Sequence, residues 1–248
     1  MKRVAAFAGL TLLLSWPLWF AVMAGKATLT PVGAFAPGAA ALITAAIGEG
    51  RSGVREIARR LTRWRFSGRW SAVAALFAPA IVAVALAIAR PGPADWSKLP
   101  LFPLVFAEVL LFTSLGEETG WRGYLLPALL ERFGPLRASA VVGLFWALWH
   151  LPLFSIPGTA QSSIPFGYFA ANLVAFSVIY TWLFRCTEGS LLPALLLHTM
   201  TDTSLAMAAL VFPTAGESEP FWVAYFWLVI GAAVAVALVS LRRSSAAG

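Results

Sequence analysis

Long apolar segments follow one another along almost the whole chain, and they limit its fold more than any other feature. Most are close to the roughly 20 residues that a helix needs to cross the hydrocarbon core of a bilayer. Hydrophobic residues make up 60% of the 248 residues and charged residues only 12%, unlike a soluble domain. We therefore predict an all-α, polytopic membrane protein of about eight transmembrane helices. The expected spans are 4–24, 33–48, 71–89, 101–131, 137–154, 166–184, 191–212 and 221–241.

The first span follows Lys2 and Arg3, and in this it resembles a secretory signal peptide. It is nearly 20 residues long, it contains Trp16, Pro17 and Trp19, and further spans follow it. We therefore expect it to be retained as the first transmembrane helix.

Basic residues indicate the orientation of the spans, because cytoplasmic loops of membrane proteins are enriched in Lys and Arg. With a cytoplasmic N-terminus, eight spans place most of the 18 basic residues on the cytoplasmic side. The C-terminus is then cytoplasmic as well. This bias accounts for the net charge of +7, so we expect an integral protein of the plasma (inner) membrane with no nucleic-acid partner. The basic residues on that side are Lys2, Arg3, Arg51, Arg55, Arg59, Arg60, Arg63, Arg65, Arg69, Arg132, Arg137, Arg185, Arg242 and Arg243.

The segment 49–70 carries seven of these arginines, interleaved with aromatic residues. An amphipathic helix on an anionic inner leaflet has this composition, and so does a cytoplasmic loop whose arginines fix the orientation. The loop is sufficient, so we assign residues 1–100 to N-terminal transmembrane helices with an Arg-rich cytoplasmic loop at 49–70. The single cysteine, Cys186, rules out an intrachain disulfide and a cysteine-based metal cluster.

Charged residues inside the fourth span are the strongest indication of a function. Glu117, Glu118 and Arg122 lie in apolar surroundings, where each charge costs about 2.5–3.5 kcal/mol on insertion scales. Glu118 and Arg122 are four residues apart, so they share a helix face and can form an ion pair. Glu117 lies about 100° around the helix from Glu118. We expect it to stay free of Arg122 and available for chemistry.

The two histidines of the chain lie at a similar depth in the membrane. Measured at about 1.5 Å per residue from the turn at 133–135, Glu117 and His150 are both some 22–24 Å from the cytoplasmic end. His198 and Asp202 are about 13 and 19 Å from it, and their spacing puts them on one helix face. The sequence therefore predicts one polar site inside the helix bundle. Glu108 lies too far from this level to join the site and is left without a role.

A carboxylate and an imidazole that reach the same water can deprotonate it for attack on a carbonyl carbon. Alternatively, Glu117, His150 and His198 could hold a divalent metal such as zinc, which lowers the pKa of bound water to about 7. Either route gives hydrolysis, with a peptide bond as the expected substrate. His198 and Asp202 are then placed to polarise the carbonyl or to stabilise the oxyanion.

The order of these residues resembles the CPBP family, which comprises the CAAX proteases and the bacteriocin-processing (Abi) intramembrane endopeptidases. Glu117, Glu118 and Arg122 match the motif E-E-x-x-x-R. The second motif, an aromatic residue four positions before a histidine, matches at Trp146 and His150, and the third, H-x-x-x-N/D, at His198 and Asp202. The family usually has Phe in the second motif and commonly Asn in the third. An ionised Asp accepts hydrogen bonds but does not donate them.

The resemblance implies a CAAX-protease-like catalytic core at 101–210, followed by a C-terminal transmembrane helix and short cytoplasmic tail at 211–248. In this core the first Glu and first His activate water, the second His and its partner stabilise the transition state, and the cavity opens to the cytoplasm. A metalloprotease and a metal-independent glutamate mechanism both stay open. The expected partners are the bilayer and a membrane-associated peptide or protein substrate. Two alternatives are a non-catalytic scaffold or bacteriocin-immunity protein, and an ion-coupled transporter.

Overall fold

The structure is a computed structural model that describes residues 1–28 and 31–245, with side chains as far as Ser240. In these residues it contains helices and no strands. Eight helical segments are long and apolar enough to cross a membrane, which confirms the predicted all-α fold and its eight spans. The segments are Lys2–Met23, Pro31–Thr62, Gly68–Ala89, Trp96–Leu130, Pro135–Ser155, Phe166–Cys186, Leu192–Val211 and Glu219–Ser240. Arg242 and Arg243, assigned to the cytoplasmic side, lie beyond the described side chains.

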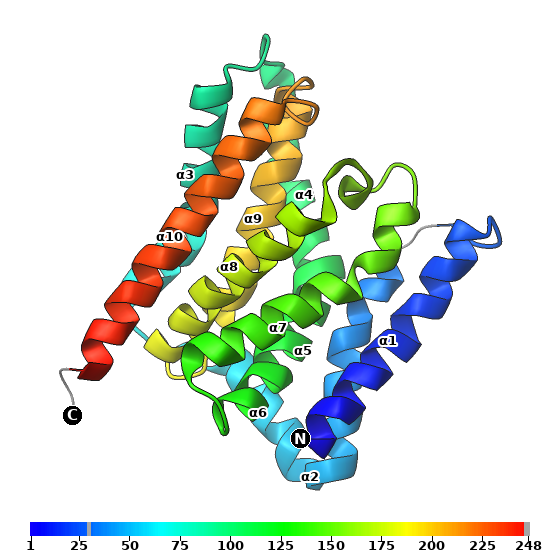
Figure 1. Cartoon of the computed structure of the whole chain (residues 1–248), viewed down its shortest axis with the longest axis vertical. Helices are drawn as coiled ribbons and strands as arrows, with labels where there is room; N and C mark the ends of the chain where they lie inside the picture. Colours follow the sequence, from blue (N-terminus) through cyan, green and yellow to red (C-terminus); the bar gives the residue numbers. More distant parts are fainter. Residues whose placement is uncertain (29–30, 246–248) are drawn as a thin grey trace.

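The helices form a bundle in which neighbours in sequence often pack together (Figure 1). Helix α1 (Lys2–Met23) packs on α2 (Ala36–Thr62), and α7 (Pro135–Trp149) packs on α8 (Phe166–Cys186). Helix α3 (Gly68–Ala89) packs on α9 (Leu192–Val211), and α10 (Glu219–Ser245) covers both α3 and α8. The start of α1 and the end of α10 lie toward the same end of the bundle (Figure 1).

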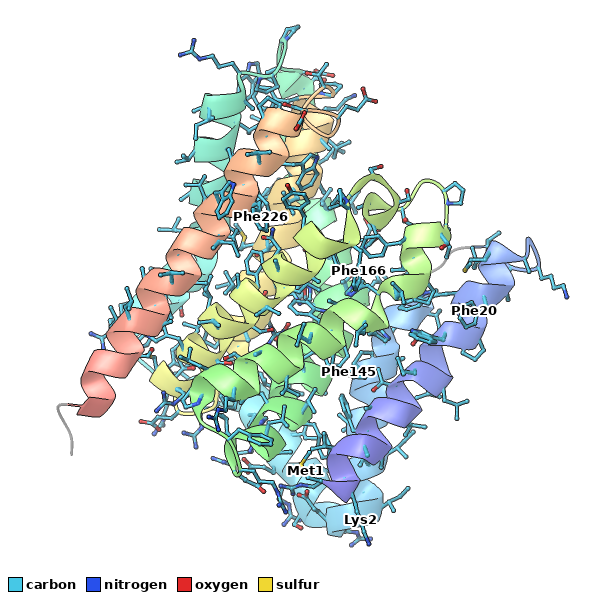
Figure 2. The ribbon with its side chains drawn as sticks, in the orientation of Figure 1. Met1, Lys2, Phe20, Phe145, Phe166 and Phe226 are labelled. Carbon is cyan, nitrogen blue, oxygen red and sulfur yellow. The ribbon has the colours of Figure 1, made fainter. Side chains whose placement is uncertain are left out.

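Large apolar side chains project from the outside of the bundle, as a lipid-facing surface requires. Phe20 on the outer face of α1 is one of them (Figure 2). Leu13, Leu76, Trp227 and Val234 are others, and each is more than half exposed. A soluble monomer rarely exposes so many large apolar side chains. The outer surface therefore supports the transmembrane assignment.

Helix α2 differs from the prediction for this part of the chain. The segment 49–70, expected as a loop, continues the helix as far as Thr62. A kink at Gly50, with φ of 65° and ψ of −148°, separates its apolar half from its arginine-rich half. Glycine adopts a positive φ without the steric cost that a side chain would add. The chain therefore changes direction at Gly50 and carries the arginines along a helix.

The fourth span is one long helical segment with two wider turns. Helices α4 (Phe102–Val109), α5 (Leu115–Gly120) and α6 (Leu126–Leu130) are joined by π-helical turns at Leu110–Ser114 and Trp121–Leu125. Such turns occur frequently at functional sites. The short helix α5, which carries Glu117 and Glu118, lies between them.

Small residues allow α5 to pack closely against the start of α2. A Cβ added at Gly120 would lie 2.4 Å from Cβ of Pro37, and one added at Gly116 would lie 2.4 Å from the backbone oxygen of Ala34. Gly116 and Gly120 form a G-x-x-x-G pair, the pattern by which transmembrane helices approach each other closely. The two glutamates between them are thereby held against the interior of the bundle.

Candidate active site

Glu117 is buried, with 3% of its surface exposed, and one of its two carboxylate oxygens is held by tryptophans. Its Oε2 atom accepts hydrogen bonds from Nε1 of Trp146 at 2.6 Å and from Nε1 of Trp121 at 3.2 Å. Among the described residues none hydrogen-bonds the other oxygen, Oε1. Glu117 makes no ion pair with Arg122. One oxygen thus fixes the side chain and leaves the other free to bind water.

Glu118 and Arg122 form the predicted ion pair. Nη1 of Arg122 donates to Oε1 of Glu118 at 2.7 Å, and both side chains are completely buried. The guanidinium lies between two aromatic rings, 4.5 Å from the ring centre of Trp146 and 3.9 Å from that of Tyr180. Its Nη2 also donates to Oγ of Ser177 at 3.3 Å. These contacts offset the cost of taking a cation out of water.

His150 is the residue at which α7 ends, one position before Leu151-Pro152. The residue before a proline is disfavoured in a helix, so α7 stops here. Nδ1 of His150 lies 2.8 Å from the backbone oxygen of Trp146. A carbonyl oxygen only accepts, so Nδ1 carries the proton and Nε2 of the neutral ring is an acceptor. No described residue hydrogen-bonds Nε2. It is a second free acceptor in the site.

His198 and Asp202 lie on one face of α9, as predicted, and both nitrogens of the imidazole face carboxylates. Nδ1 of His198 is 2.8 Å from Oε1 of Glu118, and Nε2 is 3.5 Å from Oδ2 of Asp202. The side chain of Asp202 is 41% exposed, whereas that of His198 is 5% exposed. Asp202 therefore orients His198 at the edge of the cluster.

Trp146 is the residue that joins the cluster together. Its indole contacts Glu117 and Arg122, its backbone oxygen holds His150, and its ring centre is 5.5 Å from that of His198. The two histidines and Glu117, predicted to form one site, are thus connected through one residue.

Three residues outside the predicted site complete the cluster: Trp121, Ser177 and Tyr180. Trp121 is four residues from Glu117, so the spacing that identified the Glu118–Arg122 pair would have identified it too. Ser177 and Tyr180 belong to α8, outside the motifs. Only the packing of α8 brings them to Arg122, and no local pattern in the sequence predicts this packing.

The residues considered for a metal do not converge. Among the described residues no three His, Cys, Asp or Glu side chains form a group that could hold an ion. Both nitrogens of His198 face carboxylates, so Oε1 of Glu117 and Nε2 of His150 are the free atoms of the three residues, one ligand too few for such a group. Only Nε2 of His150 offers an unused nitrogen. In this arrangement Glu117, His150 and His198 do not fit a metal, and we derive no step through one.

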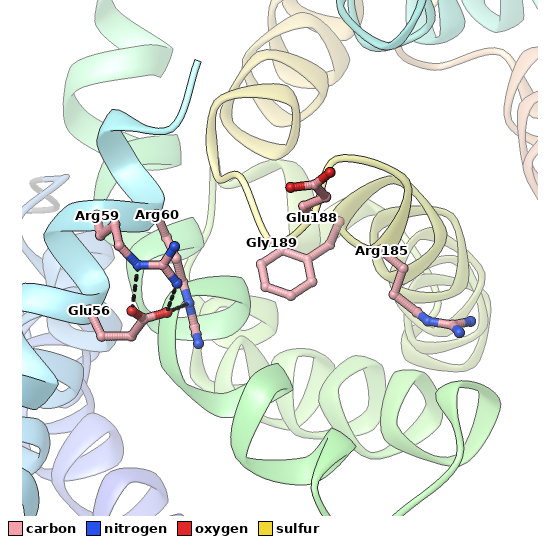
Figure 3. A pocket seen from close by; sticks show the side chains of 7 residues that line it. Glu56, Arg59, Arg60, Arg185, Glu188 and Gly189 are labelled. Atoms are coloured by element: carbon pink, nitrogen blue, oxygen red, sulfur yellow. Dashed lines mark hydrogen bonds and ion pairs between the residues drawn. The ribbon is translucent and has the colours of Figure 1, made fainter. Parts of the chain in front are cut away.

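A separate hollow of about 340 Å³ lies at the end of α2, and it contains none of these residues (Figure 3). Arg59 and Arg60 both donate to Glu56 there, as the dashed lines show (Figure 3). Nη1 of Arg60 also donates to the backbone oxygen of Gly123 at 2.8 Å. Arg59 and Arg60 are therefore tied to their own neighbours, and Arg60 anchors α2 to the fourth span next to Arg122.

The fold and the site define a class: a polytopic helical membrane protein with a buried glutamate–histidine cluster. Residues 98–204, which contain Glu117, His150, His198 and Asp202, match the family described as type II CAAX prenyl endopeptidase Rce1-like. The chain is also 28% identical over 153 residues to the CAAX prenyl protease 2 of Methanococcus maripaludis, with 56% of each protein covered. It thus spans about half the length of this curated relative. The two matches confirm the resemblance to the CPBP family.

Proposed function

We propose that this protein is an intramembrane endopeptidase of the CAAX prenyl protease type, in which Glu117 and His150 activate a water molecule. One observation carries the proposal. Trp146 holds both groups, Glu117 through its indole N–H and His150 through its backbone oxygen. In each group this contact leaves one acceptor atom without a partner among the described residues. Two free acceptor atoms, Oε1 of Glu117 and Nε2 of His150, are thus held by the same residue, as deprotonation of a bound water requires.

The proposed reaction begins when Oε1 of Glu117 takes a proton from the water while Nε2 of His150 orients it. The water oxygen attacks the carbonyl carbon of the peptide bond, and the carbonyl oxygen becomes an oxyanion. Both nitrogens of His198 face the carboxylates of Glu118 and Asp202, so we propose that its ring positions the cluster beside that charge and does not donate to it. The proton on Glu117 then passes to the leaving amine as the C–N bond breaks. The Glu118–Arg122 pair holds the cluster in position throughout.

The substrate we propose is a membrane-associated peptide or protein, with a prenylated C-terminal CAAX peptide as the first compound to test. The matched relative is named a CAAX prenyl protease 2, and this name supports the choice. We further propose that the protein resides in the plasma (inner) membrane with its site open to the cytoplasm. The arginine-rich half of α2, whose charges favour the cytoplasmic side, supports this orientation.

The proposal is tested with purified protein in liposomes and a fluorogenic prenylated CAAX-type peptide. We expect the wild type to cleave it, and Glu117→Gln and His150→Ala to lose at least about 100-fold in kcat, the lower range for general-base catalysis. Glu108→Gln is the matched control, because Glu108 lies on the same span but is exposed and outside the cluster. Full activity of Glu117→Gln would contradict the proposal. Ion flux that depends on Glu117 would instead favour a transporter, and a folded protein without either activity would favour a scaffold.

Because the candidate ligands do not converge, we propose a glutamate–histidine mechanism in preference to a metalloprotease mechanism. Incubation with 1,10-phenanthroline, followed by its removal, is expected to leave kcat within about twofold of the untreated enzyme, since the steps above use protein side chains alone. The measurement is the same peptide assay, with total zinc in the protein determined in parallel. Activity that disappears on chelation and returns with added zinc would overturn this mechanism.

A further inference from the structure

Tyr180 lies inside the candidate active site although it belongs to none of the three motifs. Its ring stacks on the guanidinium of Arg122, with a distance of 3.9 Å from the ring centre. Its ring centre is also 6.1 Å from that of Trp146 and 6.4 Å from that of His198. The whole residue is 1% exposed. Helix α8 thus contributes a phenol to a cluster that the sequence places on the fourth, fifth and seventh spans.

The hydroxyl of Tyr180 is an unused hydrogen-bond donor that is not fully shielded from solvent. No described residue hydrogen-bonds it. The oxygen of Tyr180 is not completely shielded from solvent. The oxygen of Tyr124, which also has no partner among the described residues, is completely shielded. A water-sized group can therefore still reach the oxygen of Tyr180, whereas it cannot reach that of Tyr124. A buried phenol usually finds a hydrogen-bond partner, and here the unused donor points to a ligand.

The site lacks a donor at the position where the family commonly has Asn. An ionised Asp202 accepts hydrogen bonds only, and its carboxylate already faces Nε2 of His198. Arg122 cannot replace the missing donor with its terminal nitrogens, because they donate to Glu118 and Ser177. Nε of Arg122 also has no partner among the described residues, but it is shielded from solvent. Of the described residues that contact His198, Tyr180 is the one whose donor is unpartnered and not fully shielded.

We propose that the hydroxyl of Tyr180 donates a hydrogen bond to the oxyanion of the tetrahedral intermediate, the role that Asp202 in its ionised form cannot fill. This inference rests on the proposed peptidase function. The water oxygen bonds to the carbonyl carbon, its proton goes to Glu117, and the π electrons of the carbonyl move to the oxygen that Tyr180 then faces. Tyr180 keeps its own proton throughout. Collapse of the intermediate breaks the C–N bond and returns the proton from Glu117 to the amine.

The test is Tyr180→Phe, which removes the hydroxyl and keeps the ring that stacks on Arg122. We expect kcat for the prenylated peptide to fall about 100-fold, the lower range for loss of an oxyanion donor, with KM and the thermal unfolding temperature unchanged. Tyr124→Phe is the matched control, because it removes the hydroxyl of another buried tyrosine whose oxygen is sealed off. A Tyr180→Phe enzyme with kcat within twofold of the wild type would overturn the inference.

A second comparison separates a catalytic hydroxyl from a structural one. In the Asp202→Asn background an amide donor is restored, so Tyr180→Phe should cost less in kcat there than in the wild type. Equal loss in both backgrounds would contradict the compensation between Tyr180 and residue 202. A wild type that cleaves no peptide would overturn the proposed function and this inference with it. An active wild type with an equally active Tyr180→Phe overturns the role of Tyr180 alone.

Discussion

At the scale of single residues, Trp146 determines how Glu117 is presented to a water molecule. The indole N–H holds one carboxylate oxygen at 2.6 Å, and the family usually has a phenylalanine here, which has no such donor. A hydrogen bond to a charged group contributes about 1.5–3 kcal/mol. In this chain the carboxylate therefore depends on a contact that the common family motif does not provide.

We expect Trp146→Phe to lower kcat about 10- to 100-fold, since each ~1.4 kcal/mol of transition-state stabilisation is worth a factor of ten. The phenyl ring keeps an aromatic face beside Arg122, but the lost hydrogen bond and the smaller side chain should also lower the thermal unfolding temperature, so kcat is measured well below it. Trp121→Phe is the control, because Trp121 donates to the same oxygen over a longer distance, 3.2 Å. A larger loss for Trp121→Phe than for Trp146→Phe would contradict this ranking.

The Glu118–Arg122 pair has a structural role at the same scale. Glu118→Gln leaves a completely buried guanidinium without its counter-ion, and breaking a buried ion pair costs about 3–5 kcal/mol. We therefore expect a clear fall in the unfolding temperature in detergent. Replacing both partners in Glu118→Gln/Arg122→Met should recover part of the loss. A single variant as stable as the wild type would show that the pair does not stabilise the fold.

Contacts set by helical spacing can be predicted from the sequence, although the one between Trp121 and Glu117 was missed. Contacts made by tertiary packing cannot be predicted in this way. The Glu118–Arg122 pair follows from i,i+4 geometry and is found at 2.7 Å. The role of Trp146 as a donor to Glu117, and the presence of Tyr180 beside Arg122, depend on how α7 and α8 pack on the fourth span. Neither contact is indicated by a pattern of neighbouring residues in the sequence.

At the scale of helices, the glycines that flank the glutamates decide how close α2 and α5 come together. We expect Gly120→Ala to destabilise the protein by about 1–3 kcal/mol, the usual cost of overpacking, because the added Cβ meets Pro37 at 2.4 Å. Gly123→Ala is the control on the same span, since the tightest contact of its Cβ would be with the flexible end of Leu191, at 3.2 Å. Thermal unfolding in detergent measures both. Equal stability of the two variants would contradict the close-packing account.

The number and order of the helices followed from hydropathy, but their irregularities did not. The kink at Gly50 and the helical continuation to Thr62 replace the expected loop at 49–70, because charged arginines are compatible with both a helix and a loop. The π-helical turns on either side of α5 depend on packing against neighbouring helices and leave no periodic trace in the sequence.

At the scale of the whole molecule, the start of α1 and the end of α10 share one end of the bundle (Figure 1). Cysteine labelling tests whether that end is cytoplasmic. In a Cys186→Ser background, Ser67→Cys between α2 and α3 should react with a membrane-impermeant maleimide only after the cells are opened. Ser97→Cys, at the start of the fourth span and on the opposite side of the membrane in the proposed topology, should react in intact cells. The reverse pattern would invert the proposed orientation.

We propose that Glu117 drives hydrolysis of a peptide bond inside the membrane. This role is tested most directly by incubating the prenylated peptide with the reconstituted enzyme in H₂¹⁸O and measuring the masses of the products by mass spectrometry. We expect the wild type to place one ¹⁸O in the new carboxyl terminus, and Glu117→Gln to release no product above background over the same time. Labelled product formed equally fast by Glu117→Gln would contradict the claim.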